Sequence, residues 1–523
     1  MNRRSFFSML THGSTFRTEN DTGGNRTQAV EGLDQHTTPL TRAEAFHLLR
    51  RITFAPTLPL INQIVGKTAS EALEIILGTG NEPAPTSPGT WVDQAQENPA
   101  GVDIVTKGSI ESTWKSNFAK LQNWWIEQMR TEQFPAQEKL TLFWSGHFTS
   151  EFTFDLGYIP PQLLYRQNLL LRKNRIGDFR QFLEDVTLDA AMLVYLGGNL
   201  NEKGKPNENY GREMMELFSC GISWYTEGDV KEAARVLTGW KASQFSDDVA
   251  KNGLFNAYFE PSKHDVGAKQ FMGQTIAGRD DTINTEFLVR TEEIRGIINI
   301  LFNERANPIG NFMMRKLYRY FVYSNPGTSD VTIIEALRES FKNNQFQIRP
   351  VVKELLTSKH FFDKANIGVQ IKTPAEFVVG LARQLNIPLT TGAASMALME
   401  QTLIDPPNVA GWDGYRTWIS TKTFPQRITF ANAVIKTLTD AQATAFVKQF
   451  DTYTDINKFV SGLTEYFLPV AVGQARLDYY KKILLSNGPD YEWANIIANA
   501  ATLNTRLQAT LRALAKAPDF HLC

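Results

Sequence analysis

Residues 207–240, NENYGREMMELFSCGISWYTEGDVKEAARVLTGW, decide the fold, because they predict two short helices joined by a tight turn. The first helix begins at Asn207, directly after a proline, a residue that suits a helix start because its missing N–H would be unpaired there. Gly221 ends it, since glycine adopts the left-handed backbone conformation without steric cost. Thr226 caps the second helix, and Asp229, three residues later, completes a capping box.

The first of these helices carries carboxylates at the border of its apolar face. At about 100° per residue, Asn209, Glu213 and Glu216 lie together on the flank of the apolar side chains. A carboxylate in that place is either paired or has a perturbed pKa. We therefore expect Glu213 or Glu216 to be substantially buried. The alternative to a functional site is a set of ion pairs in which Arg212 bridges Glu208 and Glu216.

Six further segments accompany this stretch: HLLRRITFAPT (47–57), LFWSGHF (142–148), KHDVGAKQFMG (263–273), RKLYRYFV (315–322), IKTPAEFVVG (371–380) and PPNVAGWDG (406–414). Together, and in this order, they resemble the signature of the large bacterial family described as domain of unknown function 1800. The resemblance extends from about residue 40 to the end of the sequence. Because that family has no assigned activity, the resemblance implies membership and no particular chemistry.

Composition is that of an ordinary globular protein, with 523 residues, 42% hydrophobic and 21% charged. The net charge of −1 argues against a nucleic-acid partner, since such partners require a basic surface. Two cysteines exclude a disulfide framework and a cysteine-based zinc site. No apolar run is long enough to span a membrane, so no membrane span is expected.

Residues 1–40 are polar and predict a disordered tail. Near its start, the pair Arg3-Arg4 followed by SFF resembles a twin-arginine export signal. Such a signal continues with an apolar segment of about 7–15 residues, whereas this chain continues with THGSTFRTENDTGGNRTQ. The sequence therefore favours a retained tail and a cytoplasmic protein, with export through a degenerate signal as the alternative.

From Thr41 onward, helical patterns follow one another, and Thr41 with Glu44 makes the first capping box. Residues 81–110 are rich in proline and glycine and predict a long loop. Residues 243–290 contain short aromatic segments between glycines and prolines, which predict a small β-hairpin excursion. Dinucleotide-binding, phosphate-loop and nucleophile-elbow motifs are missing. We predict a mainly α fold, a single large multi-helix domain over residues 41–523 with a small β-hairpin insertion.

The candidate catalytic residues are His147, His264, Glu213 and Glu216, with Asp189 as a further candidate. Histidines and carboxylates that converge suit a divalent metal such as zinc, iron or manganese. Without a metal, the same groups suit general acid–base catalysis. No spacing places two ligands on one helix, so only the fold can bring these residues together. The alternative is that each histidine is a hydrogen-bonded core residue.

Trp240 and Trp412 each follow a glycine and, with Asn209 and Arg212, are candidate ligand-binding residues. A tryptophan-lined wall suits a small aromatic or carbohydrate-like ligand, whereas core tryptophans that close loops are the alternative. Three classes of function stay open at this point. They are a hydrolase or oxidoreductase with a carboxylate–histidine centre, a binding or accessory module with a tryptophan-lined cleft, and a structural or assembly protein.

Overall fold

The computed structural model describes residues 29, 31–131, 134–154 and 157–523. Within them the fold is mainly α-helical with small β insertions, which confirms the predicted class. None of the described helices is both long and apolar enough to cross a membrane. The longer helices are α2 (Arg42–Ile52), α3 (Leu58–Ile64), α4 (Ala69–Leu77), α5 (Ile104–Thr131), α6 (Gln137–Ser145), α7 (Pro161–Asn174), α8 (Phe179–Thr187), α9 (Ala190–Tyr195), α10 (Glu208–Glu216), α11 (Glu227–Val236), α12 (Ser246–Asn252), α14 (Arg295–Glu304), α15 (Ala306–Phe321), α16 (Thr328–Asn343), α17 (Ile348–Leu356), α18 (Lys359–Phe362), α19 (Pro374–Leu385), α20 (Gly392–Leu398), α21 (Thr423–Lys436), α22 (Asp440–Lys448), α23 (Ile456–Phe467), α24 (Gln474–Leu485), α25 (Glu492–Ala498) and α26 (Ala500–Ala515).

The predicted tail falls mostly outside this description, since residues 1–28 and 30 are not part of it. Residues 31–40 run along the turn that precedes α18. Their peptide groups bond to those of residues 357–360, for instance Lys359 N–H to the carbonyl of Asp34 at 2.7 Å. This segment therefore leads directly into α2.

Capping boxes begin α2 and α11, as the sequence predicts. The amide of Glu44 donates to Thr41 Oγ1 at 3.3 Å, and the amide of Thr41 donates to the Glu44 carboxylate at 2.8 Å. At α11 the corresponding distances between Thr226 and Asp229 are 3.1 and 2.8 Å. Each box satisfies amides that the helix itself leaves unpaired.

Helix α10 is shorter than predicted, because it ends at Glu216 and not at Cys220. In the turn that follows, the amide of Phe218 donates five residues back to the carbonyl of Glu213 at 3.1 Å. This wider turn accompanies a tertiary contact, since the carbonyl of Phe218 accepts a hydrogen bond from His147 at 3.1 Å. No local sequence pattern encodes that contact.

The structure has two antiparallel strand pairs where the sequence predicts one β-hairpin within residues 243–290, and the first strand begins earlier, at Trp240. Strand β1 (Trp240–Ala242) pairs with β2 (Ala257–Phe259), and β3 (Lys269–Phe271) pairs with β4 (Gln274–Ile276). Helix α12 lies between β1 and β2, and β3 packs on α11. The β insertion therefore extends the α10–α11 hairpin.

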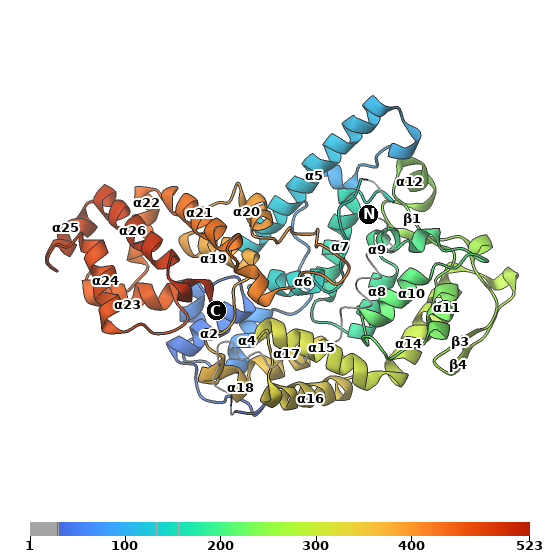
Figure 1. The fold of residues 1–523 in the computed structure, drawn as a ribbon, viewed down its shortest axis with the longest axis horizontal. Helices are drawn as coiled ribbons and strands as arrows, with labels where there is room; N and C mark the ends of the chain where they lie inside the picture. Colours follow the sequence, from blue (N-terminus) through green and yellow to red (C-terminus); the bar gives the residue numbers. More distant parts are fainter. Residues whose placement is uncertain (1–28, 30, 132–133, 155–156) are drawn as a thin grey trace.

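Figure 1 shows helices α21 to α26 gathered at one end of the molecule, and helices α10, α11, α12 and α14 with the strands at the other. Helices α6 and α15 lie between these ends. The loop that joins α20 to α21, orange in Figure 1, reaches back toward α6 and α7. One hydrophobic core cluster contains residues from Leu40 to Phe520, so it includes both ends of the described chain.

Candidate functional site

A cavity of about 230 Å³ lies where the end of α6, helix α15 and the loop between α20 and α21 meet. We name it the Trp412 cavity. The lining side chains that bear on its chemistry are His147, Lys316, Arg319, Trp412, Asp413 and Tyr415. His147 and Trp412 are candidates from the sequence, and the fold brings them to the same cavity.

Two glycines bring the cavity walls together. Gly411 has φ of +91°, and a Cβ placed there would collide with the carbonyl oxygen of Gly146. A Cβ at Gly146 would in turn lie 3.4 Å from the ring of Trp412. Nearby, Thr149 Oγ1 donates to the carbonyl of Val409 at 2.7 Å. The WSGH and VAGW segments therefore pack backbone against backbone, which positions the indole beside the histidine turn.

Lys316 and His147 form a hydrogen-bonded pair in the wall of the cavity. Lys316 Nζ donates to His147 Nδ1 at 2.9 Å, and His147 Nε2 donates to the carbonyl of Phe218 at 3.1 Å. Because a carbonyl only accepts, the ring proton lies on Nε2 and Nδ1 keeps its lone pair. The pair therefore fixes both the histidine tautomer and the direction of the lysine amine.

Burial favours the neutral form of both members of this pair. The pKa of His147 lies well below its usual value, first because of burial and then because of the positive charge of Lys316. Burial and the neighbouring charge of Arg319 lower the pKa of Lys316 to about 7. A lysine amine in this state is a nucleophile and a base near neutral pH.

A second cavity of about 410 Å³ lies beside the first, and Trp412, Asp413 and Trp418 line both. It adds the carboxylates of Glu400 and Asp405. Burial raises the pKa of Asp405 to about 6, although the amide of Phe152 opposes this shift by donating to the carboxylate. Trp412 therefore borders a basic and an acidic cavity. Its buried indole nitrogen has no hydrogen-bond partner within the described chain.

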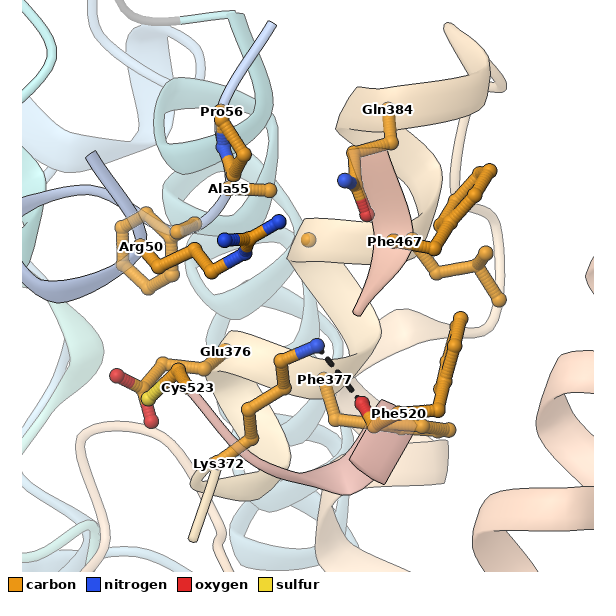
Figure 2. Close-up of a pocket in the computed structure, with 13 residues that line it drawn as sticks. Arg50, Ala55, Pro56, Lys372, Glu376, Phe377, Gln384, Phe467, Phe520 and Cys523 are labelled. Atoms are coloured by element: carbon orange, nitrogen blue, oxygen red, sulfur yellow. Dashed lines mark hydrogen bonds between the residues drawn. The ribbon is translucent and has the colours of Figure 1, made fainter. Parts of the chain in front are cut away.

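The segment of residues 370–373, after α18, lines the Trp412 cavity on one side. A much smaller pocket of about 10 Å³ adjoins the same segment. Figure 2 shows Lys372 directed at Phe520, whose carbonyl accepts its ammonium hydrogen at 2.8 Å. Alongside, the backbones of Gln370 and Cys523 exchange hydrogen bonds of 2.8 and 3.2 Å. This pocket holds about one water molecule, so its residues support the cavity wall and do not bind a larger ligand.

Glu213 is buried, as predicted, and only 6% of it is exposed. Burial raises its pKa to about 7, the charge of Glu216 adds to this shift, and Arg212 opposes it. No hydrogen-bonding group of the described residues contributes to that shift. Glu213 does not line the Trp412 cavity. Burial and Glu151 raise the pKa of the nearby Tyr195 phenol, and the carboxyl group of Glu213 adds a smaller contribution.

The ion pairs of α10 differ from the predicted alternative. Arg212 does not bridge Glu208 and Glu216, because its guanidinium binds the carboxylate of Glu227 with two hydrogen bonds of 2.7 Å. Its distance to the Glu208 carboxylate is 3.8 Å. The half-buried Glu216 instead accepts a hydrogen bond from the hydroxyl of Tyr225. The sequence places Glu227 in the next helix, so spacing along one helix could not identify this partner.

The side-chain Nδ2 of Asn209 donates to the carbonyl of Leu196 at 3.1 Å, which ties α10 to the end of α9. Asp189 begins α9 as its N-cap and accepts hydrogen bonds from Gln167 Nε2 at 2.9 Å and Met192 N–H at 3.0 Å. Burial raises the pKa of Asp189 to about 7. The side chains of Asn209 and Asp189 therefore both have hydrogen-bond partners in α9 or in the elements packed beside it.

His264 belongs to a separate buried charge network. Its Nδ1 lies 2.8 Å from the carbonyl of Thr238, and its Nε2 lies 3.2 Å from the carboxylate of Glu293. Lys269 and Arg279 also bind that carboxylate, at 2.6 and 2.8 Å. His264 thus joins the β insertion to the residues before α14, and it does not line the Trp412 cavity.

Trp240 is a core residue, since only 2% of it is exposed and its ring centroid lies 5.3 Å from that of Phe259. Trp412, in contrast, lines a cavity. For metal binding, the described residues contain no group of three or more histidine, cysteine, aspartate or glutamate side chains arranged to hold an ion.

Sequence reasoning missed Lys316 and Arg319, although both belong to the quoted segment RKLYRYFV. They are three residues apart, so they lie on the same face of α15. Two basic residues on the border of an apolar helix are the signal that could have identified them. What they face depends on the loop before α21, which the local pattern does not show.

The comparisons with known proteins add a family and nothing more specific. The family model described as "Protein of unknown function (DUF1800)" matches residues 47–522. No curated protein and no solved structure matches the chain.

Proposed function

The chain belongs to the DUF1800 family, whose description assigns no activity, and from its own geometry we propose that it is an enzyme with the Trp412 cavity as its active site. In this proposal the amine of Lys316 attacks the carbonyl carbon of a small molecule. The observation that carries the proposal is the hydrogen bond between Lys316 and His147 in the wall of a cavity.

The surroundings of Lys316 support a nucleophilic amine. An exposed lysine is almost fully protonated at neutral pH because its pKa is about 10.4. Lys316 has a pKa lowered to about 7 by burial and by Arg319, so the neutral amine is well populated. Desolvation and a nearby cation are the two means by which enzymes activate lysine.

The chemical step needs no group beyond this chain and its substrate. The amine nitrogen of Lys316 forms a bond to the carbonyl carbon, the C–O bond breaks, and the oxygen leaves as water with two protons from the amine. The product is an imine between Lys316 and the substrate. His147 is a positioning residue, because its Nδ1 accepts from the amine while its Nε2 is held by the Phe218 carbonyl.

Reductive alkylation tests the proposal. Acetaldehyde with cyanoborohydride marks amines that form imines, and peptide mass spectrometry locates the mark. We expect the labelling rate of Lys316 to reach half its maximum at a pH of about 7, because only the neutral amine reacts. The exposed Lys448 serves as an internal reference on the same protein. Labelling of Lys316 that follows Lys448 at every pH contradicts the proposal.

Two variants sharpen this experiment. Lys316→Met removes the reactive amine without adding a permanent charge beside Arg319, so labelling at this position should disappear while the unfolding midpoint stays near that of the native chain. His147→Gln removes the ring that orients the amine, so labelling should slow and its pH midpoint should move. If His147→Gln changes neither rate nor midpoint, the histidine has no role in the amine chemistry.

The carboxylate–histidine centre predicted from the sequence remains a second candidate. Glu213 supports it best, because a buried carboxyl group with a pKa near 7 suits general acid–base catalysis. His147 donates a hydrogen bond to the carbonyl of Phe218, in the turn that follows the same helix. We favour the Trp412 cavity because it combines a reactive group with space for a substrate.

A further inference from the structure

Resting on the proposed function, we infer that the substrates are small 2-oxo acids, with the carbonyl carbon at Lys316 and the adjacent carboxylate at Arg319. This assignment names a substrate class for the Trp412 cavity. Its basis is the placement of one amine and one guanidinium on the same helix face, both lining the same cavity.

Arg319 lies one helical turn after Lys316 on α15. Its Nε donates to the carbonyl of Ser324 at 2.9 Å, which fixes the plane of the guanidinium. The two terminal nitrogens have no hydrogen-bond partner within the part of the chain that the structure describes. A guanidinium with two open, coplanar donors fits a carboxylate in the bidentate manner.

The charges around the cavity favour an anion near Arg319. Helix α15 contributes Lys316 and Arg319 to the lining, with Arg315 exposed on the same helix outside it. The turn after α6 contributes His147, whose neutral form burial favours. From the loop before α21, Asp413 is the acidic side chain in the lining, and Tyr415 adds a phenol. Asp413 and Arg319 are both exposed, so solvent screens the two charges alike, but Lys316 and Arg319 outnumber the one carboxylate of the lining. A bound carboxylate would therefore balance the excess of basic groups in the wall.

The size and shape of the cavity agree with a small substrate. Its volume of about 230 Å³ is below the roughly 300–1,000 Å³ of sites for drug-sized ligands. The ring of Trp412 offers an apolar surface for the side chain of the acid. A 2-oxo acid contacts three groups of the lining at once: its carbonyl carbon meets Lys316, its carboxylate meets Arg319 and its side chain meets Trp412.

The imine step balances without a cofactor. The lysine amine gives up two protons, the keto oxygen leaves as water, and the carboxylate stays bound to Arg319 throughout. A neutral ketone can undergo the same step but lacks the second anchor. Charge-assisted bidentate hydrogen bonds contribute about 1.5–3 kcal/mol, which corresponds to a roughly ten- to hundredfold preference for the acid.

Reductive trapping with pyruvate and with acetone tests this inference on the full chain. Both probes carry a methyl ketone, and only pyruvate adds a carboxylate. With cyanoborohydride, we expect pyruvate to mark Lys316 roughly ten- to a hundredfold faster than acetone. Arg319→Gln should reduce the ratio of the pyruvate rate to the acetone rate to about one, and both rates should fall somewhat because the pKa of Lys316 rises when the charge of Arg319 is removed. Arg315→Gln, a matched loss of charge at an exposed position outside the lining, should preserve the preference.

The outcomes separate the two proposals. Equal trapping of pyruvate and acetone at Lys316 overturns the substrate class and leaves the amine mechanism standing. Trapping of neither probe, with no labelling by acetaldehyde, overturns the proposed function itself. As an independent measurement, Lys316→Met cannot form the imine but should still bind pyruvate by titration calorimetry. Loss of that binding in the double variant Lys316→Met/Arg319→Gln supports the carboxylate site, and unchanged binding contradicts it.

Discussion

Burial perturbs Glu213 and Lys316 in opposite directions, to pKa values that both lie near 7. Removing a charge from water is costly, so each side chain shifts toward its neutral form. For Lys316 the cavity makes that neutral form useful, because a substrate can reach the amine. For Glu213 the consequence concerns stability, because the neutral carboxyl is buried at a helix flank.

The variant Glu213→Gln should change how stability depends on pH. The folded-state pKa of about 7 exceeds the ordinary value of 4.5, so the native state holds a proton that the unfolded state has lost. Stability from this group is therefore present below pH 4.5 and is lost as pH rises toward 7. The loss is on the order of 3 kcal/mol. Urea unfolding between pH 4.5 and 8 measures it.

In Glu213→Gln this part of the pH dependence should disappear. Glu208→Gln removes a more accessible carboxylate from the same helix and is the matched control. Identical pH dependence in Glu213→Gln and the native chain would show that Glu213 is ionised in the folded state.

At the level of elements, the Trp412 cavity depends on how the turn after α6 meets the loop before α21. Gly146 and Gly411 allow the two backbones to approach, and the hydrogen bond from Thr149 to Val409 extends the contact. Since α15 contributes the reactive amine, three separate elements must dock for the cavity to form. The loop is therefore as important for the site as the helix that carries Lys316.

Gly411→Ala should disrupt this docking. Its φ of +91° disfavours any L-residue by about 1–2 kcal/mol, and the new methyl group would collide with the Gly146 carbonyl. We expect a lower unfolding midpoint and slower aldehyde labelling of Lys316. Gly108→Ala is the control, because its helical site is open and alanine favours helix. Native labelling in Gly411→Ala would mean that the loop does not shape the cavity.

At the level of the whole molecule, α6 connects distant parts through two adjacent buried charges. Arg172 on α7 binds the carboxylate of Glu138 with two hydrogen bonds of 2.7 Å, and Trp125 on α5 adds a third of 2.7 Å. The ammonium of Lys139 binds the carboxylate of Glu376 on α19, far along the chain. Helix α6 therefore links the first half of the fold to the segment that lines the Trp412 cavity.

Glu376→Gln should lower the free energy of unfolding by about 3–5 kcal/mol, because it leaves Lys139 charged and buried without its partner. Glutamine still completes a capping box, so the start of α19 is preserved. The double variant Lys139→Met/Glu376→Gln should recover most of the loss. Glu400→Gln, which breaks the exposed pair with Lys422, should change stability by less than about 0.5 kcal/mol. Equal effects of Glu376→Gln and Glu400→Gln would refute the role of the buried pair.

Much of the local structure could be predicted from the sequence. The capping boxes of α2 and α11 were predicted residue by residue, because each involves side chains and amides only three positions apart. The mainly α class followed from helical periodicity, and the burial of Glu213 followed from its place on the flank of α10. In all these cases the deciding interactions lie within one or two turns of the chain.

Only the tertiary structure decided where the candidate site lies and which partners its residues have. Periodicity identifies a buried flank but not what covers it. For that reason Lys316 was missed, and Glu293 was not recognised as the partner of His264. The end of α10 moved from its predicted place as Phe218 met His147. The sequence by itself determines the mainly α class, the capping boxes of α2 and α11, and the family. The cavity depends on glycine contacts and charge pairs between segments far apart in the chain, whose free energies exist only after those segments have docked.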